Sequence, residues 1–272
     1  MMPIKCEAEL LGNEKIAGDI WRTTLLAPAL ARAAGPGQFV MVKGGKGADP
    51  PLWRRPFSIH QVIDSERIQL LIKAVGTGSE FIVSRRPGET VSLVGPLGRG
   101  FTLPEHAENI CVIGGGVGAA PLFYLTRQLL THSTKPDTIK VFLGGATAAD
   151  IQVLEKDFSG LGAAVQVATD DGSAGHHGLV TELLFHELNP AKQWRVYSCG
   201  PHPMMKSVAL YCLDRKWPCQ VSLETLMACG ISACLGCVVP GTGQTDLDGG
   251  GPYLHVCKEG PVFEAGEVRW ET

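Results

Sequence analysis

The residues with the clearest capacity for chemistry are four cysteines near the C-terminal end of the chain. Cys229, Cys234 and Cys237 form a C-x4-C-x2-C run, and Cys257 supplies a distant fourth thiol. Two irons bridged by sulfides need four outer thiolates, and a short loop can supply three of them while the fourth returns from elsewhere. This plant-type spacing predicts a [2Fe–2S] cluster.

Three other interpretations of these cysteines remain open. A zinc site also uses four cysteines, but usually as two separated C-x2-C pairs. Cys234-Leu-Gly-Cys237 alone could be a redox dithiol, although it lacks the preceding strand of a thioredoxin-like unit. Buried structural thiols are the third possibility. Gly230 and Gly236 favour the cluster, because they let the backbone approach an inorganic core and direct N–H groups at sulfur.

Two motifs in the first hundred residues could hold a phosphate-bearing cofactor. In Arg54-Arg-Pro-Phe-Ser-Ile59, an extended backbone would place an arginine and a serine on one edge. The arginine offers a fork of donors for a pyrophosphate, and the serine a hydroxyl for a ring nitrogen or carbonyl. Leu71-Ile-Lys73 precedes the turn Gly76-Thr-Gly-Ser79, which could present backbone N–H groups to phosphate. Taken singly, each motif also fits an ordinary barrel strand or turn.

A nucleotide site is also indicated in the middle of the chain. A buried strand from Asn109 leads into Gly114-Gly-Gly-Val-Gly118 and then a helix. Gly114-x-Gly116-x-x-Ala119 satisfies a relaxed dinucleotide fingerprint, which is a weak signal by itself. The usual acidic residue is missing after the second strand, where two glycines follow Leu143. Cys199-Gly-Pro201 follows a later strand, at the edge where parallel sheets bind ligands.

Other chemistry-bearing residues are interpreted as structural. Asp170, Asp171, His176 and His177 lie in a glycine-rich loop, where neighbouring side chains rarely converge on a metal. We expect a solvated loop there, followed by a helix from Val180. The remaining cysteines are expected to be small apolar fillers: Cys6, Cys111, Cys212 and Cys219.

The elements that must position these residues predict a multidomain chain. From Ile4 to Phe101, short alternating runs broken by Gly, Pro and Asp predict an antiparallel β-barrel. The middle of the chain alternates apolar strands with helical spacers, which predicts an α/β domain with a parallel sheet. We therefore expect a barrel domain over residues 1–103, a nucleotide-binding α/β domain over 104–217, and a small cluster domain over 218–272.

Composition limits the classes of function. The 272 residues carry a formal charge of −3, so no basic excess exists to neutralise nucleic-acid phosphates. No apolar segment is long enough to span a bilayer, and the N-terminus lacks the apolar run of a signal peptide. Nine cysteines, an odd number, favour a reducing compartment. We expect a cytoplasmic protein without nucleic-acid or membrane partners.

Together these motifs resemble the ferredoxin reductase superfamily. R-P-x-S, G-x-G-[TS] and G-P-L-G-x-G-F are similar to its FAD-binding barrel, and GGG-x-G-x-x-P with C-G-P to its NAD domain. The resemblance implies FAD contacts at Arg55, Pro56, Phe57, Ser58, Leu71, Ile72, Lys73, Gly78 and Ser79. It implies an NAD site that includes Gly114, Gly116, Gly118, Cys199, Gly200 and Pro201.

The order of the three parts resembles one family more closely. V-S-L-E-x-x-M-x-C-G-I-x-A-C-x-G-C-V and V-C-x-x-G-P-V-F are similar to the electron-transfer subunits of NAD-dependent, class 1B dihydroorotate dehydrogenases. The resemblance implies electron transfer between NAD and the FMN of a separate catalytic subunit, through FAD and the cluster, in de novo pyrimidine (UMP) biosynthesis. It also implies a heterotetramer of two plus two chains. No residue resembles a substrate base, so we expect no catalytic residue in this chain.

Two other functions remain open. One is an NAD(P)H-dependent reductase subunit of a hydrogenase or sulfite reductase, and the other is a zinc-stabilised interaction module. We expect NAD rather than NADP, because the segment from Gly144 to Ile151 has no cation for a 2′-phosphate and contains Asp150. The cluster loop is strongly apolar and is predicted to dock on the partner through some of these residues: Leu226, Met227, Ile231, Ala233, Leu235, Val238 and Val239.

Overall fold

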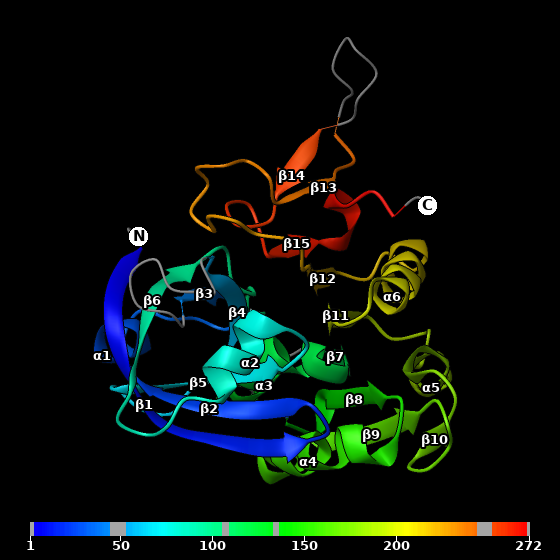
Figure 1. Cartoon of the computed structure of the whole chain (residues 1–272). Coiled ribbons are helices and arrows are strands. Elements are labelled where there is room, and N and C mark those ends of the chain that lie inside the picture. The colour runs from blue at the N-terminus through cyan, green and yellow to red at the C-terminus, as the bar shows by residue number, and fades with distance from the viewer. Residues whose placement is uncertain (1–2, 44–52, 105–108, 133–135, 244–251, 271–272) are drawn as a thin grey trace.

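The N-terminal part of the chain closes into a six-stranded antiparallel barrel (Figure 1). The computed structural model describes residues 3–43, 53–104, 109–132, 136–243 and 252–270. Around the barrel the strands follow the order β1-β2-β5-β4-β3-β6. Their bounds are β1 Ile4–Ala17, β2 Ile20–Leu26, β3 Phe39–Lys43, β4 Arg55–Val62, β5 Arg67–Lys73 and β6 Thr90–Leu97, with short helices α1 Pro28–Ala31 and α2 Thr77–Val83. The barrel predicted from the alternating runs is therefore confirmed.

The middle of the chain forms a seven-stranded sheet with helices on both faces. The strand order is β10-β9-β8-β7-β11-β12-β15, parallel throughout except for the last strand. Helices α3 and α4 pack on one face of the sheet, and α5 and α6 on the other. The helices are α3 Ala119–His132, α4 Ala148–Gly160, α5 Val180–Glu187 and α6 His202–Asp214; the strands are β7 Asn109–Gly115, β8 Ile139–Gly145, β9 Ala164–Thr169, β10 His176–His177, β11 Trp194–Cys199, β12 Cys219–Ser222 and β15 Val262–Glu264.

The C-terminal part of the chain contributes strands to the sheet and also forms a separate strand pair. Strands β12 and β15 extend the sheet, whereas β13 Val238–Pro240 and β14 Tyr253–His255 form a separate antiparallel pair. Between β12 and β13 the chain makes the loop that carries three of the four cysteines. The expected division between residues 217 and 218 thus falls before a strand of the sheet, and it stays a prediction. Most of the connection expected from Thr242 to Gly251 lies outside the described residues.

Helix α3 fixes the barrel against the sheet. The ring of His60, on β4, stacks on Phe123 with 4.6 Å between centroids, and its Nδ1 lies 3.1 Å from the Ala120 carbonyl oxygen. Burial lowers the pKa of this histidine to about 4, so the ring is neutral near pH 7. Arg22 of β2 also forms an ion pair with Asp157 of α4. These contacts hold the two cofactor-binding parts in one arrangement. Among the described residues, no helix is both long and apolar enough to cross a membrane.

Candidate functional site

A cavity of about 340 Å³, here called the flavin-side cavity because most of the residues predicted to contact FAD line it, lies where the barrel meets the sheet. Strand β5 shows why: Ile68, Leu70 and Ile72 face the barrel interior, whereas Leu71 faces outward into the cavity. Pro56, Phe57 and Ser58 of β4 line the same space, together with residues that follow β12. Most of the residues predicted to contact FAD are thus brought together on the outer face of the barrel.

Arg55 lies against the glycine turn, an arrangement that suits the pyrophosphate role implied by the resemblance. A Cβ added to Gly78 would lie 2.8 Å from Arg55 Nε, so a larger residue would require the Arg55 side chain to move. Arg55, Lys73 and the turn residues from Gly76 to Ser79 line a further cavity of about 280 Å³. A guanidinium beside backbone N–H groups is suited to bind phosphate oxygens.

The structure adds detail to two of the predicted FAD residues, Ile72 and Ser79. The side chain of Ile72 is fully buried in the barrel core, so only its backbone can reach a cofactor on the outer face. The Ser79 hydroxyl accepts hydrogen bonds from the N–H groups of Val75 and Gly76, at 3.1 and 3.3 Å, and donates to the Gly76 carbonyl. Its main role in the structure is to fix the turn that faces Arg55.

The two glycine-containing strand ends of the sheet meet. Gly114 and Cys199 are register partners on β7 and β11. A Cβ on Gly118 would lie 2.5 Å from the Gly200 Cα, and one on Gly115 would lie 2.7 Å from Pro201 Cδ. The structure therefore brings together the two segments that the sequence assigned to one NAD site.

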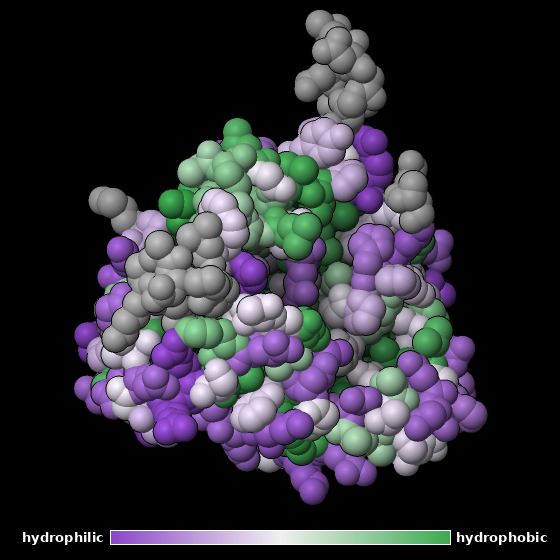
Figure 2. All heavy atoms as spheres, in the orientation of Figure 1, coloured by the Kyte–Doolittle hydropathy of each residue, from purple (hydrophilic) through white to green (hydrophobic). Residues whose placement is uncertain are grey.

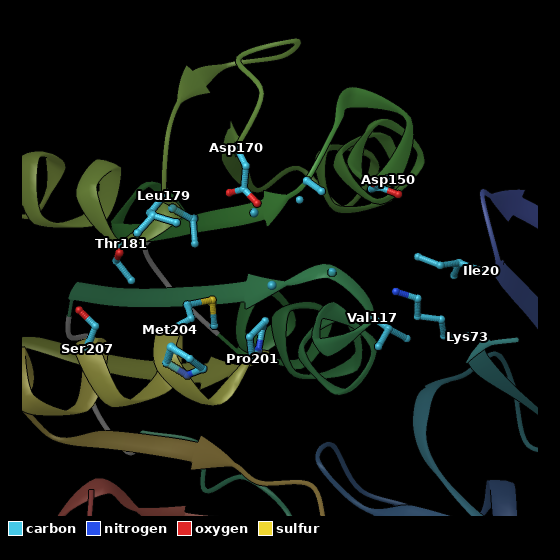
Figure 3. A pocket seen from close by; sticks show the side chains of 17 residues that line it. Ile20, Lys73, Val117, Asp150, Asp170, Leu179, Thr181, Pro201, Met204 and Ser207 are labelled. Carbon is cyan, nitrogen blue, oxygen red and sulfur yellow. The ribbon is translucent and has the colours of Figure 1, made fainter. Parts of the chain in front are cut away.

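A cavity of about 570 Å³ opens at this edge of the sheet (Figure 3). Gly115, Gly116 and Pro201 line it together with Lys73 of the barrel, which also lines the flavin-side cavity. Asp170, at the end of β9, lines this cavity too. It belongs to the loop that we expected to be solvated, and Asp170, Asp171, His176 and His177 are indeed exposed. No local sequence pattern indicated that Asp170 lines this cavity, because its position there depends on β9 lying beside β8 in the sheet.

The flavin-side cavity contains one group that sequence reasoning did not single out, and this group affects the predicted residue Cys199. Glu224 lines the flavin-side cavity, and burial raises the pKa of its carboxyl. Burial, followed by the charge of Glu224, also raises the pKa of the Cys199 thiol, which is therefore protonated near pH 7. The only signal for Glu224 was its place in the V-S-L-E motif.

The cysteine loop directs backbone donors at sulfur, as predicted. Cys229 Sγ accepts from the N–H groups of Ile231, Ala233 and Cys234 at 3.3–3.4 Å. Burial acts to raise the pKa of Cys229, but these donors outweigh it and lower the pKa to about 7. A thiolate is the form that binds iron.

The four thiols are arranged as two pairs. Side-chain contacts join Cys229 to Cys234 and Cys237 to Cys257, and the Cys257 N–H donates to Cys237 Sγ at 3.4 Å. Within the described part of the chain, no three Cys, His, Asp or Glu side chains form a group that could hold one metal ion. Two pairs fit a two-iron cluster, in which each iron takes two thiolates, better than a single zinc ion.

Comparisons with known proteins agree with this geometry. Residues 224–269 match the model of the iron–sulfur cluster binding domain of dihydroorotate dehydrogenase B, and residues 112–209 match the oxidoreductase NAD-binding domain. The chain is 38% identical, over 97% of its length and 98% of the relative, to the electron transfer subunit of dihydroorotate dehydrogenase B (NAD(+)) from Desulforamulus reducens. The subunit of that name from Enterococcus faecalis is 36% identical, over 95% of this chain and 96% of its own.

The chain belongs to the family of dihydroorotate dehydrogenase B electron transfer subunits.

Solved structures agree with the fold of this family. An NADH-dependent reduced ferredoxin–NADP oxidoreductase, studied for flavin-based electron bifurcation, superposes with a TM-score of 0.81 at 29% identity, covering 97% of this chain and 90% of the other. The ferredoxin reductase of carbazole 1,9a-dioxygenase shares the fold, with a TM-score of 0.67 at 24% identity, covering 79% of this chain and 67% of the other. As a family member, this electron transfer subunit uses FAD, a [2Fe–2S] cluster and NAD.

Proposed function

We propose that this electron transfer subunit carries electrons between NAD and the FMN of a dihydroorotate-oxidising catalytic subunit, through FAD and the cluster, in pyrimidine biosynthesis. The observation that carries the proposal is the order of the sites. The flavin-side cavity shares Lys73 and Val117 with the NAD cavity, and it shares Phe39 and Met227 with the region of the cysteine loop. FAD therefore has its site between a two-electron partner and a one-electron partner.

The proposed reaction balances through these sites. Dihydroorotate loses two electrons and two protons in the partner. NAD+ takes up both electrons and one proton as a hydride, and one proton is released. The cluster passes one electron at a time, so two passages serve each hydride, and flavin chemistry joins the two regimes. The roles of this chain's own residues are to hold FAD at Arg55 and Ser58, NAD at the glycine turn and Cys199–Pro201, and iron at the four cysteines.

Several finer features belong to the same proposal. We propose a heterotetramer of two catalytic and two electron transfer subunits. We place it in the cytoplasm, because the odd number of cysteines favours a reducing compartment. We also propose the three domains 1–103, 104–217 and 218–272. Strand pairing supports the first boundary, because the last barrel strand ends at Leu97 and the first sheet strand begins at Asn109.

Reconstitution with the partner tests this function. The isolated chain is expected to reduce an artificial dye with NADH but to leave dihydroorotate unoxidised, because the proposal assigns dihydroorotate oxidation to the catalytic subunit. Anaerobic affinity purification should recover a complex that contains both FAD and FMN and couples dihydroorotate to NAD+. Oxidation of dihydroorotate by the isolated chain, or a coupled complex without FMN, would contradict the proposal. A hydrogenase or sulfite reductase partner would instead support the other reductase function.

Asp170 is proposed to exclude NADP. Asp150 and Asp170 both line the NAD cavity. The carboxylate of Asp150 accepts two hydrogen bonds from Thr147, at 3.0 and 2.9 Å, and caps α4, so Asp170, directly after β9, is the carboxylate that we assign to this role. A carboxylate in that wall would repel a 2′-phosphate. We expect dye reduction to favour NADH over NADPH by at least about tenfold, or about 1.4 kcal/mol. Asp170→Ser should reduce that preference by about the same factor.

The neighbouring acid provides the control for this experiment. Asp171 does not line the cavity, and its carboxylate accepts hydrogen bonds from Ser173. Asp171→Asn keeps an acceptor and should leave the cofactor preference of the wild type unchanged. Equal efficiency of the wild type with NADH and NADPH would refute the proposed role of Asp170.

A further inference from the structure

Strand β3 of the barrel is apolar on both of its faces. Val40 and Val42 belong to the barrel core, as the alternation of a strand requires. Phe39 and Met41 point to the opposite, outer face, yet they are only 3% and 0% exposed. Their cover is the C-terminal region, because both residues form one buried group with Cys237 and Cys257. The loop between β12 and β13 lies over this end of the barrel in Figure 1.

The cysteine loop approaches β3 too closely for a side chain at the contact. Gly230 has a φ of +69°, and a Cβ there would lie 2.4 Å from Met41 Cγ and 2.7 Å from its Sδ. We expected Gly230 to make room for the inorganic core. That expectation stays a prediction, and the structure adds that Gly230 also makes room for Met41. Gly236 fits the original expectation better, since the atom nearest to an added Cβ would be Cys234 Sγ at 3.9 Å.

The flavin-binding strand lies directly beside this contact. Phe39 is the register partner of Ser58, and Met41 is the partner of Pro56. Partners on adjacent antiparallel strands lie about 5 Å apart and on the same face. Phe39 lines the flavin-side cavity, as does Met227 from the cysteine loop, and Met227 also packs against the group that contains Cys237 and Cys257.

The two pairs of thiols face different surroundings. Cys237 and Cys257 are 2% and 5% exposed and lie against Phe39 and Met41. Cys234 is exposed and Cys229 is partly so. One end of the cysteine site is therefore enclosed by apolar side chains that reach the flavin-side cavity, and the other end faces outward.

We propose that Phe39, Met41 and Met227 are positioning residues for electron transfer between FAD and the cluster. They form an apolar partition between the flavin-side cavity and the Cys237–Cys257 pair, which fixes the separation of the two centres and offers no hydrogen-bond donor to these sulfurs from the barrel side. The polar contacts of the pair come from elsewhere: the Cys257 N–H donates to Cys237 Sγ at 3.4 Å, and the Ser232 hydroxyl lies 3.8 Å from Cys257 Sγ. This inference rests on the proposed function, in which these cysteines hold the cluster. Each transfer moves one electron with no bond made or broken, and two transfers account for one hydride. Hydrogen bonds to sulfur and solvent exposure set the reduction potential of an iron–sulfur cluster. The partition controls both, so it controls how electrons divide between the cluster and FAD at equilibrium.

The test changes the polarity of the partition without changing its volume. Met227→Gln introduces an amide, and Met227→Leu is the apolar control of similar size. The chain is reduced stepwise with NADH under anaerobic conditions. FAD is followed by absorbance and the reduced cluster by EPR. One hydrogen bond from the amide to sulfur is worth about 1 kcal/mol, so the division of electrons should shift about fivefold toward the cluster in Met227→Gln. Met227→Leu should match the wild type.

A second pair of variants, at Met41 on the barrel strand β3, tests the same partition independently. Met41→Gln should shift the division of electrons toward the cluster, and Met41→Leu should match the wild type. This pair still provides the test if Met227→Gln fails to retain its iron. A glutamine variant that keeps its iron but divides electrons as the wild type does would overturn the partition. So would leucine variants that shift the division as strongly as glutamine. Absence of iron from the wild-type chain would instead refute the proposed function itself, which keeps the two failures distinguishable.

Discussion

Replacing Cys234 with serine is expected to remove the iron–sulfur cluster while NADH still reduces the bound FAD. The wild-type chain should be reddish-brown, contain about two irons and show an EPR signal when reduced. Cys234 is the most exposed of the four cysteines, and it packs in none of the described hydrophobic cores. Its loss should therefore remove one ligand without disturbing the barrel or the sheet. Because serine is a poor ligand for iron compared with a thiolate, the iron content should fall close to zero.

A cysteine outside the cluster loop supplies the matched control. Cys6 lies on β1 and is partly exposed, and Cys6→Ser should retain both iron and colour. NADH-dependent dye reduction should persist in both variants, because neither residue lines the FAD or NAD cavity. Normal iron in Cys234→Ser, or a colourless wild-type chain loaded with zinc, would contradict the cluster assignment and favour the zinc-stabilised module.

Local patterns in the sequence were sufficient to predict the local backbone shapes of the candidate sites. Both glycine turns and the C-x4-C-x2-C run depend on backbone shapes that a few neighbouring residues determine. The strand–turn–helix at Gly114–Gly118 and the N–H donors to Cys229 were therefore predictable in kind. Alternation also predicted the barrel, because its strands have one face in a common core.

Features that depend on contacts between distant segments could not be predicted in this way. Asp170 was interpreted as part of a solvated loop, and only the order of strands in the sheet brings it to the NAD cavity. The contact of Gly230 with Met41, from another part of the chain, was likewise not predictable from the local sequence. Ile72 was included among the FAD contacts by resemblance, but the alternation of β5 sends its side chain into the barrel core.

The joining of the cluster region to the sheet has a physical consequence. Strand β12 pairs with β11 on one side and with β15 on the other, so the cysteine loop leaves directly from the sheet that carries the NAD site. The loop also packs on β3 of the barrel. The cysteine loop is therefore fixed by the sheet and by the barrel, and only its outward-facing surface is free to contact a partner.

Leu235→Glu is expected to weaken assembly with the catalytic subunit by about a hundredfold in Kd, or about 2.7 kcal/mol, while FAD reduction by NADH persists. Apolar side chains gather on this part of the surface in Figure 2. Leu226 is 93% exposed and Leu235 57%, and Ile231 of the same loop is half exposed. An apolar patch beside a redox centre is best explained as an interface, because its exposure to water is unfavourable in a free chain. A glutamate at its centre would have to be buried without a partner, which is costly.

The control for this variant is a leucine of similar exposure on another element. Leu210 of α6 is 48% exposed and belongs to none of the cofactor cavities, so Leu210→Glu should assemble like the wild type. Binding can be measured by titrating each chain with the catalytic subunit, and coupling by dihydroorotate-dependent reduction of NAD+. In Leu235→Glu, coupling should fall with binding and return at high partner concentration, because the glutamate affects docking and leaves both redox centres intact. If Leu235→Glu binds and couples as the wild type does, the partner docks elsewhere. If Leu210→Glu fails equally, added charge rather than the position of the patch is responsible.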